Sequence, residues 1–407
     1  MIARYSALGL TNEQMAANPV WVDKTGNGHD LQMKNFAWKE GSGISDIYPG
    51  ALVFDGVDDY GICNNFPILT KEKGYTVVAL RQFLGSRNSF LISNRVTGTA
   101  SSNGAFIFER FWEGSGTIFY NFGTPSDQLS LKPDSPFSYL TSKSYNGRAT
   151  NAGDAAPSNT LLVGKSIIND SNSTNAAVWE ICILDHDATE EELTKIKDYF
   201  VKTYPWLFPD QAWTVVGKTN EDEDRATIAN ITGNGNDLVL SNLGFAEGSG
   251  YNEEGEYAGY LVTDGVDDKV QSSSFTMNED WTIVGDWELL SNVQINCGIV
   301  KAQNVYLYNI ANGLLISINN PRSLQSFGTK SLHAICSDGR LYDRNWVEYE
   351  YTVDQNFAIV ESSLNIGFNL NNYTQIAFKN LGIYNNQILS KDDCIKAYNY
   401  LQTLKTK

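Results

Sequence analysis

The chain repeats the stretch Thr25-Gly26-Asn27-Gly28-His29-Asp30-Leu31 as Thr232-Gly233-Asn234-Gly235-Asn236-Asp237-Leu238, with six of the seven residues unchanged. Three further motifs recur in the same order and at nearly the same spacing: Gly9-x-Thr11-Asn12-Glu13 with Gly217-x-Thr219-Asn220-Glu221, Gly41-Ser42-Gly43 with Gly248-Ser249-Gly250, and Asp55-Gly56-Val57-Asp58-Asp59 with Asp264-Gly265-Val266-Asp267-Asp268. Self-similarity at a period of this size indicates a repeated structural unit. Since the first matches begin close to Met1, we predict one domain at residues 1–205 and a second at residues 206–407.

Each copy is expected to end in a short helix, at about residues 189–204 and 390–404. Thr189 and Ser390 are favourable N-cap residues, and each is followed three positions later by an acidic residue, as in a capping box. Apolar residues then recur at helical spacing, which predicts one buried face on each helix. These residues are Leu193, Ile196 and Phe200 in the first copy, and Ile395, Tyr398 and Leu401 in the second.

The remaining sequence favours an all-β fold. Hydrophobic residues make up 42% and charged residues 19% of the 407 positions, so the chain can build a core and lacks the composition of a disordered protein. Short β-forming segments alternate with tight-turn signals such as Asn312-Gly313 and Asp338-Gly339. This spacing predicts two-sheet sandwiches of the jelly-roll type.

The charge balance excludes some partners. The chain has 30 Lys and Arg against 47 Asp and Glu, a formal net charge of −17, so nucleic acid and anionic lipid surfaces are not expected to bind. No apolar run is long enough to predict membrane insertion, and no export signal is recognised near Met1. The five cysteines show no CxxC spacing, so neither a disulfide framework nor a zinc site is indicated.

Three motifs resemble the laminin-G-like branch of the concanavalin A-like lectin/glucanase fold. Phe54-Asp55-Gly56-Val57-Asp58-Asp59-Tyr60 is similar to its FDG-x-x-DY strand-turn-strand. Residues 23–31 are similar to the D-x-S-G-N-G loop that precedes it, and Tyr145-Asn146-Gly147 to its Y-x-N-G hairpin. The resemblance implies two tandem concanavalin A-like jelly-roll sandwiches, of the kind found in bacteriophage and prophage structural proteins of gut bacteria. The second copy departs further from the pattern, with Thr263 in place of Phe54.

No catalytic constellation is recognised. The Glu-x-Asp-x-x-Glu strand of glycoside hydrolases with this fold is absent, and the nearest stretch, Glu109-Arg110-Phe111-Trp112-Glu113, separates its carboxylates too widely for paired catalysis. His29, His186 and His333 do not recur between the copies, and we expect them to be structural or solvent-facing. We therefore predict that the chain is not an enzyme.

Metal binding is weighed against turn formation. Family members often hold Ca²⁺ with Asp, Asn and backbone oxygens, and Asp23, Asn27 and Asp30 could supply such ligands. The same residues are those that a tight turn requires, as are those of residues 55–59. We favour turns without a metal or other cofactor, with Ca²⁺ as the alternative.

Glycan binding is the chemistry that remains. Aromatic rings stack on the C–H faces of sugars, and Arg, Asn and Asp bond to the hydroxyls. The candidate residues are Arg110, Trp112 and Tyr120 in the first copy and Tyr306, Tyr308, Arg344 and Trp346 in the second. Each could instead face the core, because alternate residues of a strand point inward.

We therefore expect a non-enzymatic bacteriophage virion component, such as a fibre, appendage or decoration protein. It would be made in the host cytoplasm, and its sandwiches would bind host glycans or other virion proteins. Homo-oligomers are compatible with this reading. The alternative is a glycan-binding adhesin at the bacterial cell surface or secreted from the cell.

Overall fold

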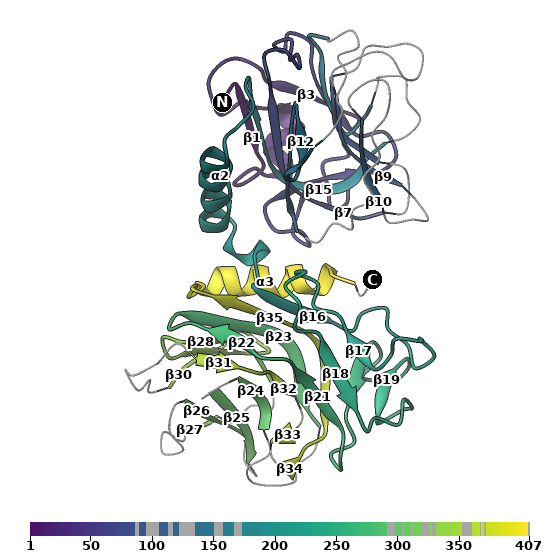
Figure 1. Cartoon of the computed structure of the whole chain (residues 1–407), viewed down its shortest axis with the longest axis vertical. Helices are drawn as coiled ribbons and strands as arrows, with labels where there is room; N and C mark the ends of the chain where they lie inside the picture. The colour runs from purple at the N-terminus through teal and green to yellow at the C-terminus, as the bar shows by residue number, and fades with distance from the viewer. Residues whose placement is uncertain are drawn as a thin grey trace. The chain divides into compact units, whose positions relative to one another are not determined.

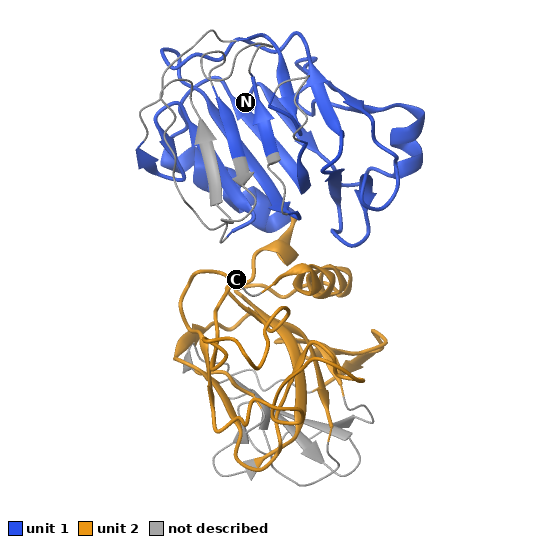
Figure 2. Ribbon diagram, turned by 90° about the vertical axis from the view of Figure 1, so that its right-hand side faces the viewer, with its two compact units in different colours: residues 1–203 blue, residues 204–407 orange. Residues whose placement is uncertain are grey.

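The computed structural model divides the chain into two compact units, Met1–Thr203 and Tyr204–Lys407 (Figure 2). It describes residues 1–85, 89–94, 106–112, 117–121, 135–149, 158–166, 173–290, 298–302, 305–310, 313–318, 325–327, 331–351, 360–366, 368–369 and 372–405. Each unit has its own hydrophobic core.

The described part of unit 1 forms two antiparallel sheets. The first has the order β13 (Arg148–Ala149), β12 (Ser144–Tyr145), β11 (Phe137–Thr141), β7 (Thr76–Phe83), β15 (Asn175–Leu184), β5 (Ala51–Asp55) and β4 (Gly43–Ser45), and β1 (Ala3–Ser6) also pairs with β15. The second has the order β10 (Thr117–Asn121), β9 (Ile107–Trp112), β8 (Ser89–Ser93), β14 (Leu161–Val163), β6 (Tyr60–Cys63), β3 (Leu31–Lys34) and β2 (Val20–Trp21).

Unit 2 repeats this topology within its described residues. Its first sheet has the order β30 (Glu348–Glu350), β29 (Arg340–Asp343), β28 (Leu332–Cys336), β23 (Trp281–Leu289), β35 (Ile376–Asn385), β20 (Tyr260–Val262) and β19 (Gly250–Asn252), with β16 (Gln211–Thr214) paired to β35. The second has the order β27 (Gln325–Phe327), β26 (Gly313–Ile318), β25 (Val305–Ile310), β24 (Gly298–Ala302), β32 (Asn365–Ile366), β21 (Lys269–Ser272), β18 (Leu238–Ser241) and β17 (Thr227–Ile228). Two small pairs, β22 (Phe275–Met277) with β31 (Val360–Ser362) and β33 (Phe368–Asn369) with β34 (Asn372–Tyr373), complete it.

The predicted all-β sandwich fold is confirmed, and its core lies between the two sheets of each unit. In unit 1, Phe54 and Val178 of the first sheet belong to the same buried cluster as Trp21 and Phe108 of the second. The central strand β15 is buried at every position after Asn175, which shows that both of its faces are covered. Such strands have continuous apolar sequences instead of alternating ones.

The repeated motifs build the same scaffold in both units. Asn12, in α1 (Asn12–Ala17), donates to the carbonyl of Ile44 and accepts from its N–H group. Asn220 makes the same two bonds to Tyr251. Ser42 and Ser249 bond to Asp59 and Asp268 in the two hairpins. The motifs recur because each fixes one loop against another.

The two expected C-terminal helices are present as α2 (Glu190–Thr203) and α3 (Lys391–Thr403), with the 3₁₀ helix η1 (Pro205–Leu207) after α2. Thr189 forms a reciprocal capping box with Glu192, and Ser390 accepts the Asp393 N–H. Figure 1 shows α3 crossing the sheet that contains β35 and β23.

The predicted buried face of α3 was partly wrong. Leu401 is buried, but Ile395 and Tyr398 are half-buried, because the buried face also includes Cys394, Ala397 and Tyr400. Tyr398 therefore lies at the edge of the helix. None of the helices in the described ranges combines the length and apolar character needed to cross a membrane.

Candidate functional site

Five of the seven predicted glycan-binding residues lie on strands whose backbone is described. Arg110 and Trp112 lie on β9, Tyr120 on β10, and Tyr306 and Tyr308 on β25. Their side chains lie outside the described part of the structure. These five assignments therefore stay predictions.

The other two residues, Arg344 and Trp346, lie in the turn between β29 and β30. Asp343 builds this turn, since its Oδ1 accepts the N–H groups of Asn345 and Val347 at 2.8 and 2.9 Å. Its carbonyl also accepts the N–H of Trp346 at 2.9 Å. Trp346 has a φ of 58°, in the left-handed region that most residues avoid. The turn leaves Arg344 exposed and Trp346 half-buried.

Trp346 belongs to a cluster of three rings from three separate elements. His333 of β28 stacks on Tyr398 of α3, with ring centroids 4.2 Å apart. The Trp346 ring is steeply inclined to both, with ring centroids 5.4 Å apart at 61° to His333 and 5.7 Å apart at 84° to Tyr398. All three side chains are half-buried, so the cluster lies at the surface of unit 2.

A carboxylate lies beside these rings. Asp286 of β23 is 9% exposed, and its Oδ2 accepts hydrogen bonds from the Tyr260 hydroxyl at 3.0 Å, the Tyr398 hydroxyl at 3.2 Å and the Gln402 amide at 3.0 Å. All three donors are uncharged. Tyr398 thus connects the ring cluster to the carboxylate. We define the unit 2 face as the three rings, Asp286 with its other donors Tyr260 and Gln402, and Arg344.

Burial and charge set the titration behaviour of this face. Burial lowers the pKa of His333 below its ordinary value, against the opposing effect of Asp286, so the ring is neutral at pH 7. Burial, followed by the charge of Asp286, raises the pKa of Tyr398 and Tyr260, which keeps both hydroxyls protonated as donors. At the solvent-exposed side of the face, Arg344 Nη1 lies 3.8 Å from Glu288 Oε2.

The sequence did not reveal Asp286, Tyr260 or Tyr398 as site residues. In unit 1, Leu80 pairs with Glu180 next to a bulge. In unit 2, Asp286 pairs with Asn380 next to the corresponding bulge, so Leu80 and Asp286 occupy equivalent positions. Unit 2 therefore has an acidic residue at the position where unit 1 has a buried leucine. A repeat-to-repeat comparison of strands could have found this signal, but the short motifs that define the repeat lie elsewhere.

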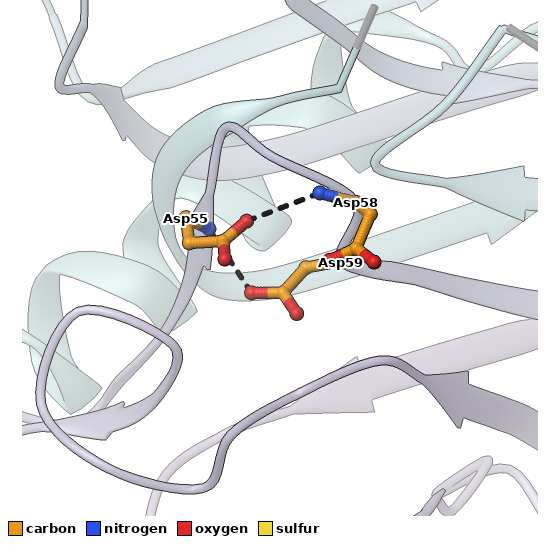
Figure 3. A group of neighbouring side chains, drawn as sticks. All are labelled: Asp55, Asp58 and Asp59. Atoms are coloured by element: carbon orange, nitrogen blue, oxygen red, sulfur yellow. Dashed lines mark hydrogen bonds between the residues drawn. The ribbon is translucent and has the colours of Figure 1, made fainter. Parts of the chain in front are cut away.

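The aspartate hairpins are organised by their own turns. Asp55, Asp58 and Asp59 have carboxylate oxygens within 4.8 Å of one another, as do Asp264, Asp267 and Asp268. Asp55 Oδ1 accepts the N–H of Val57. Figure 3 shows the two bonds within the group, from the Asp58 N–H to Asp55 Oδ1 and from the Asp55 N–H to Asp59 Oδ2. Turn formation and the bond from Ser42 hold these carboxylates in place, as the expectation of a tight turn predicts.

The loop at residues 23–31 is also held by hydrogen bonds to an aspartate. Asp23 accepts the N–H groups of Arg4 and Thr25 at 3.0 Å and the hydroxyl of Thr25. Asn230, at the corresponding place in unit 2, accepts the N–H groups of Ala212 and Thr232. The amide oxygen of Asn230 thus accepts the same kind of loop N–H groups as the Asp23 carboxylate, so the role that the two residues share is to hold the loop.

Glu109 lies in the interior of unit 1. It is fully buried, accepts two 2.6 Å hydrogen bonds from the Arg81 guanidinium and one at 2.7 Å from the Tyr145 hydroxyl. Its carboxylate is occupied by these donors. Glu113 lies outside the described residues.

Comparison with protein-family models gives no match, and comparison with curated proteins gives none either. Solved structures with detectable similarity include a sialidase of Trypanosoma rangeli in complex with sialic acid, at 9% identity and a TM-score of 0.36 over 88% of this chain and 63% of the sialidase. Another alignment to that sialidase covers 49% of this chain and only 32% of the enzyme, at 12% identity and a TM-score of 0.33. The binding domain of botulinum neurotoxin serotype D aligns at 10% identity and a TM-score of 0.37 over 95% of this chain and 97% of the domain. At these values neither protein assigns a function to the chain.

Proposed function

We propose that the chain is a non-enzymatic glycan-binding protein built from two laminin-G-like sandwiches, and that the unit 2 face binds the glycan. The observation that carries this proposal is the half-buried cluster of Trp346, His333 and Tyr398 next to the Asp286 carboxylate.

This arrangement has the parts that sugar recognition uses. Half-buried aromatic rings offer flat apolar surface to the C–H face of a pyranose, while carboxylate and guanidinium groups orient its hydroxyls. Trp346 and Tyr398 supply the rings, and Asp286 and Arg344 the polar groups. The four residues come from β23, α3 and one turn, so the scaffold holds them in place before a ligand arrives.

The state of Glu109 supports a binding role over a catalytic one. A glycoside hydrolase needs two carboxyl groups that reach the scissile bond. Glu109 is buried and bonded to Arg81 and Tyr145, so it does not reach a substrate.

For the biological setting we propose a virion component such as a fibre, appendage or decoration protein. The tandem sandwiches and the resemblance of their motifs to bacteriophage and prophage proteins support this setting. A bacterial adhesin, at the cell surface or secreted, is the second candidate. Mass spectrometry of particles purified after prophage induction should detect the chain in the virion. Its absence from particles and presence in the cell envelope would favour the adhesin.

The first prediction tests the unit 2 face. Trp346→Ala should weaken glycan binding about tenfold, because the ring that stacks on the sugar is lost. The measurement is a screen of the full chain against a glycan panel, followed by titration calorimetry with the best ligand. Val347→Ala, an exposed side chain in the same turn, is the matched control and should bind as the wild type does. Absence of binding to every glycan, or equal binding by Trp346→Ala, would contradict the proposal.

A further inference from the structure

The unit 2 face holds a carboxylate that the described residues leave without a cation. The three groups that bond to Asp286 are two hydroxyls and an amide. Among the described residues, no lysine or arginine nitrogen lies within 4.0 Å of it. The guanidinium of Arg344 contacts the Glu288 carboxylate at 3.8 Å.

One oxygen of this carboxylate remains open to a partner. All three donors bond to Oδ2, and no group in the described part of unit 2 donates to Oδ1. An almost buried carboxylate gains stability from a second set of donors, and a charged donor gives the stronger bond.

The other charged groups around the face do not cancel this charge. Glu288 and Asp343 add negative charge, while Arg344 and Lys379 add positive charge. Lys379 lies over the Tyr260 ring, with its ammonium 5.5 Å from the ring centroid. Counted with Asp286, these five groups leave one net negative charge, and His333 contributes none at neutral pH.

Aromatic rings beside an unneutralised carboxylate form the arrangement that recognises ammonium groups. The electron-rich faces of Trp and Tyr attract a cation, and the carboxylate accepts its N–H groups. Trp346 and Tyr398 lie together at 5.7 Å, and the Tyr398 hydroxyl contacts Asp286. A ligand that stacks on these rings can therefore direct a charged amine toward Asp286.

We infer that the unit 2 face selects amino sugars, meaning glycans with a free protonated amine, over neutral sugars, and that it disfavours carboxylated sugars. This inference rests on the proposed function, since it names the ligand class of the same face. Attraction of the amine and repulsion of a carboxylate both follow from the charge of Asp286.

The test compares three forms of one backbone by titration calorimetry with the full chain. The probes are β-linked N-acetylglucosamine oligomers, the same oligomers after deacetylation, and oligomers oxidised to carboxylates at C6. We expect the deacetylated form to bind about tenfold more tightly than the acetylated form, and the carboxylated form to bind most weakly. The preference should shrink as salt is raised, because mobile ions screen a partly exposed charge pair.

Asp286→Asn identifies the source of this preference. The amide can still accept hydrogen bonds from Tyr260 and Tyr398. Because Asp286 also orients hydroxyls of the neutral sugar, the variant should bind both oligomers more weakly, and the ratio of their affinities should fall to about one. Glu221→Gln, in the exposed acidic loop, changes the net charge by the same amount away from the face and should retain the preference.

Different results would contradict the amino-sugar inference and the proposed glycan binding. Equal affinity for the amine and the neutral sugar, or an unchanged preference in Asp286→Asn, would overturn the amino-sugar inference and leave glycan binding intact. Absence of binding to all three probes and to the wider glycan panel would overturn both.

Discussion

Asp59 and Asp268 lie at the same place in the two hairpins, and both are buried carboxyls. Asp59 is fully buried and bonds to Ser42 and to the Asp55 N–H, while its Oδ1 has no partner among the described residues. Burial raises the pKa of Asp59 to about 7, and it raises the pKa of Asp268 as well. Each therefore binds its proton more tightly in the folded chain than in the unfolded one.

This raised pKa predicts a pH dependence of stability. The unfolded carboxyl titrates near 3.8, so the contribution of Asp59 is complete below that pH and is lost as the pH rises toward about 7. Each unit of pKa difference corresponds to about 1.4 kcal/mol. We expect Asp59→Asn to reduce the fall in unfolding free energy between pH 4 and pH 7 by roughly 2 kcal/mol or more in urea titrations. Parallel pH profiles for the variant and the wild type would refute this assignment.

At the scale of the elements, one buried ion pair connects the two sheets of unit 1. Arg81 belongs to β7 of the first sheet and Glu109 to β9 of the second, and Tyr145 of β12 adds a hydrogen bond to Glu109. Glu109 adopts a φ of 62°, a conformation that costs roughly 1–2 kcal/mol in a non-glycine residue. In unit 2, Trp287 occupies the place of Arg81 beside the same bulge, and Leu341 that of Tyr145.

The contrast between the units predicts how this ion pair responds to mutation. Glu109→Leu should lower the unfolding free energy by roughly 3–5 kcal/mol, because it leaves a buried guanidinium without its partner. The double variant Arg81→Leu/Glu109→Leu should recover most of this loss, since it leaves no buried charge without a partner, and unit 2 has the apolar Trp287 and Leu341 where unit 1 has Arg81 and Tyr145. Denaturant titrations of the two single variants and the double variant measure the coupling. A double variant less stable than Glu109→Leu would show that the charges themselves are required.

The repeated motifs were enough to predict the duplication and the fold class. They are turn residues, and the backbone geometry of a tight turn restricts which residue types can occupy it. The C-terminal helices followed from cap residues and apolar spacing. Binding residues lack such local constraints. The face of unit 2 joins β23, β28, α3 and a turn, and only the folded sheet brings Asp286 and Tyr398 together. Trp346 and Arg344 were predicted from residue type alone, which did not reveal their neighbours.

For the whole molecule, the separate cores imply that unit 1 and unit 2 unfold in separate transitions. Gly43 and Gly250 allow this to be tested with a matched pair. Both have positive φ, of 148° and 157°. A Cβ at Gly250 would lie 2.6 Å from Asn220 Oδ1, and one at Gly43 would collide with Asn12 Oδ1. Neither position can accept alanine without moving the loop that the asparagine holds.

We expect Gly43→Ala and Gly250→Ala each to cost roughly 3 kcal/mol, and each to lower only one of two transitions in scanning calorimetry. For domains of this size the midpoint should fall by roughly 6–12 °C. Gly41→Ala and Gly248→Ala are the controls, since their φ values of 85° and 84° are strained but a Cβ would meet no atom within 4 Å. They should cost only about 1 kcal/mol. If Gly43→Ala and Gly250→Ala shift one common transition by the same amount, the two units unfold as a single cooperative structure, and the independence inferred from their separate cores is wrong.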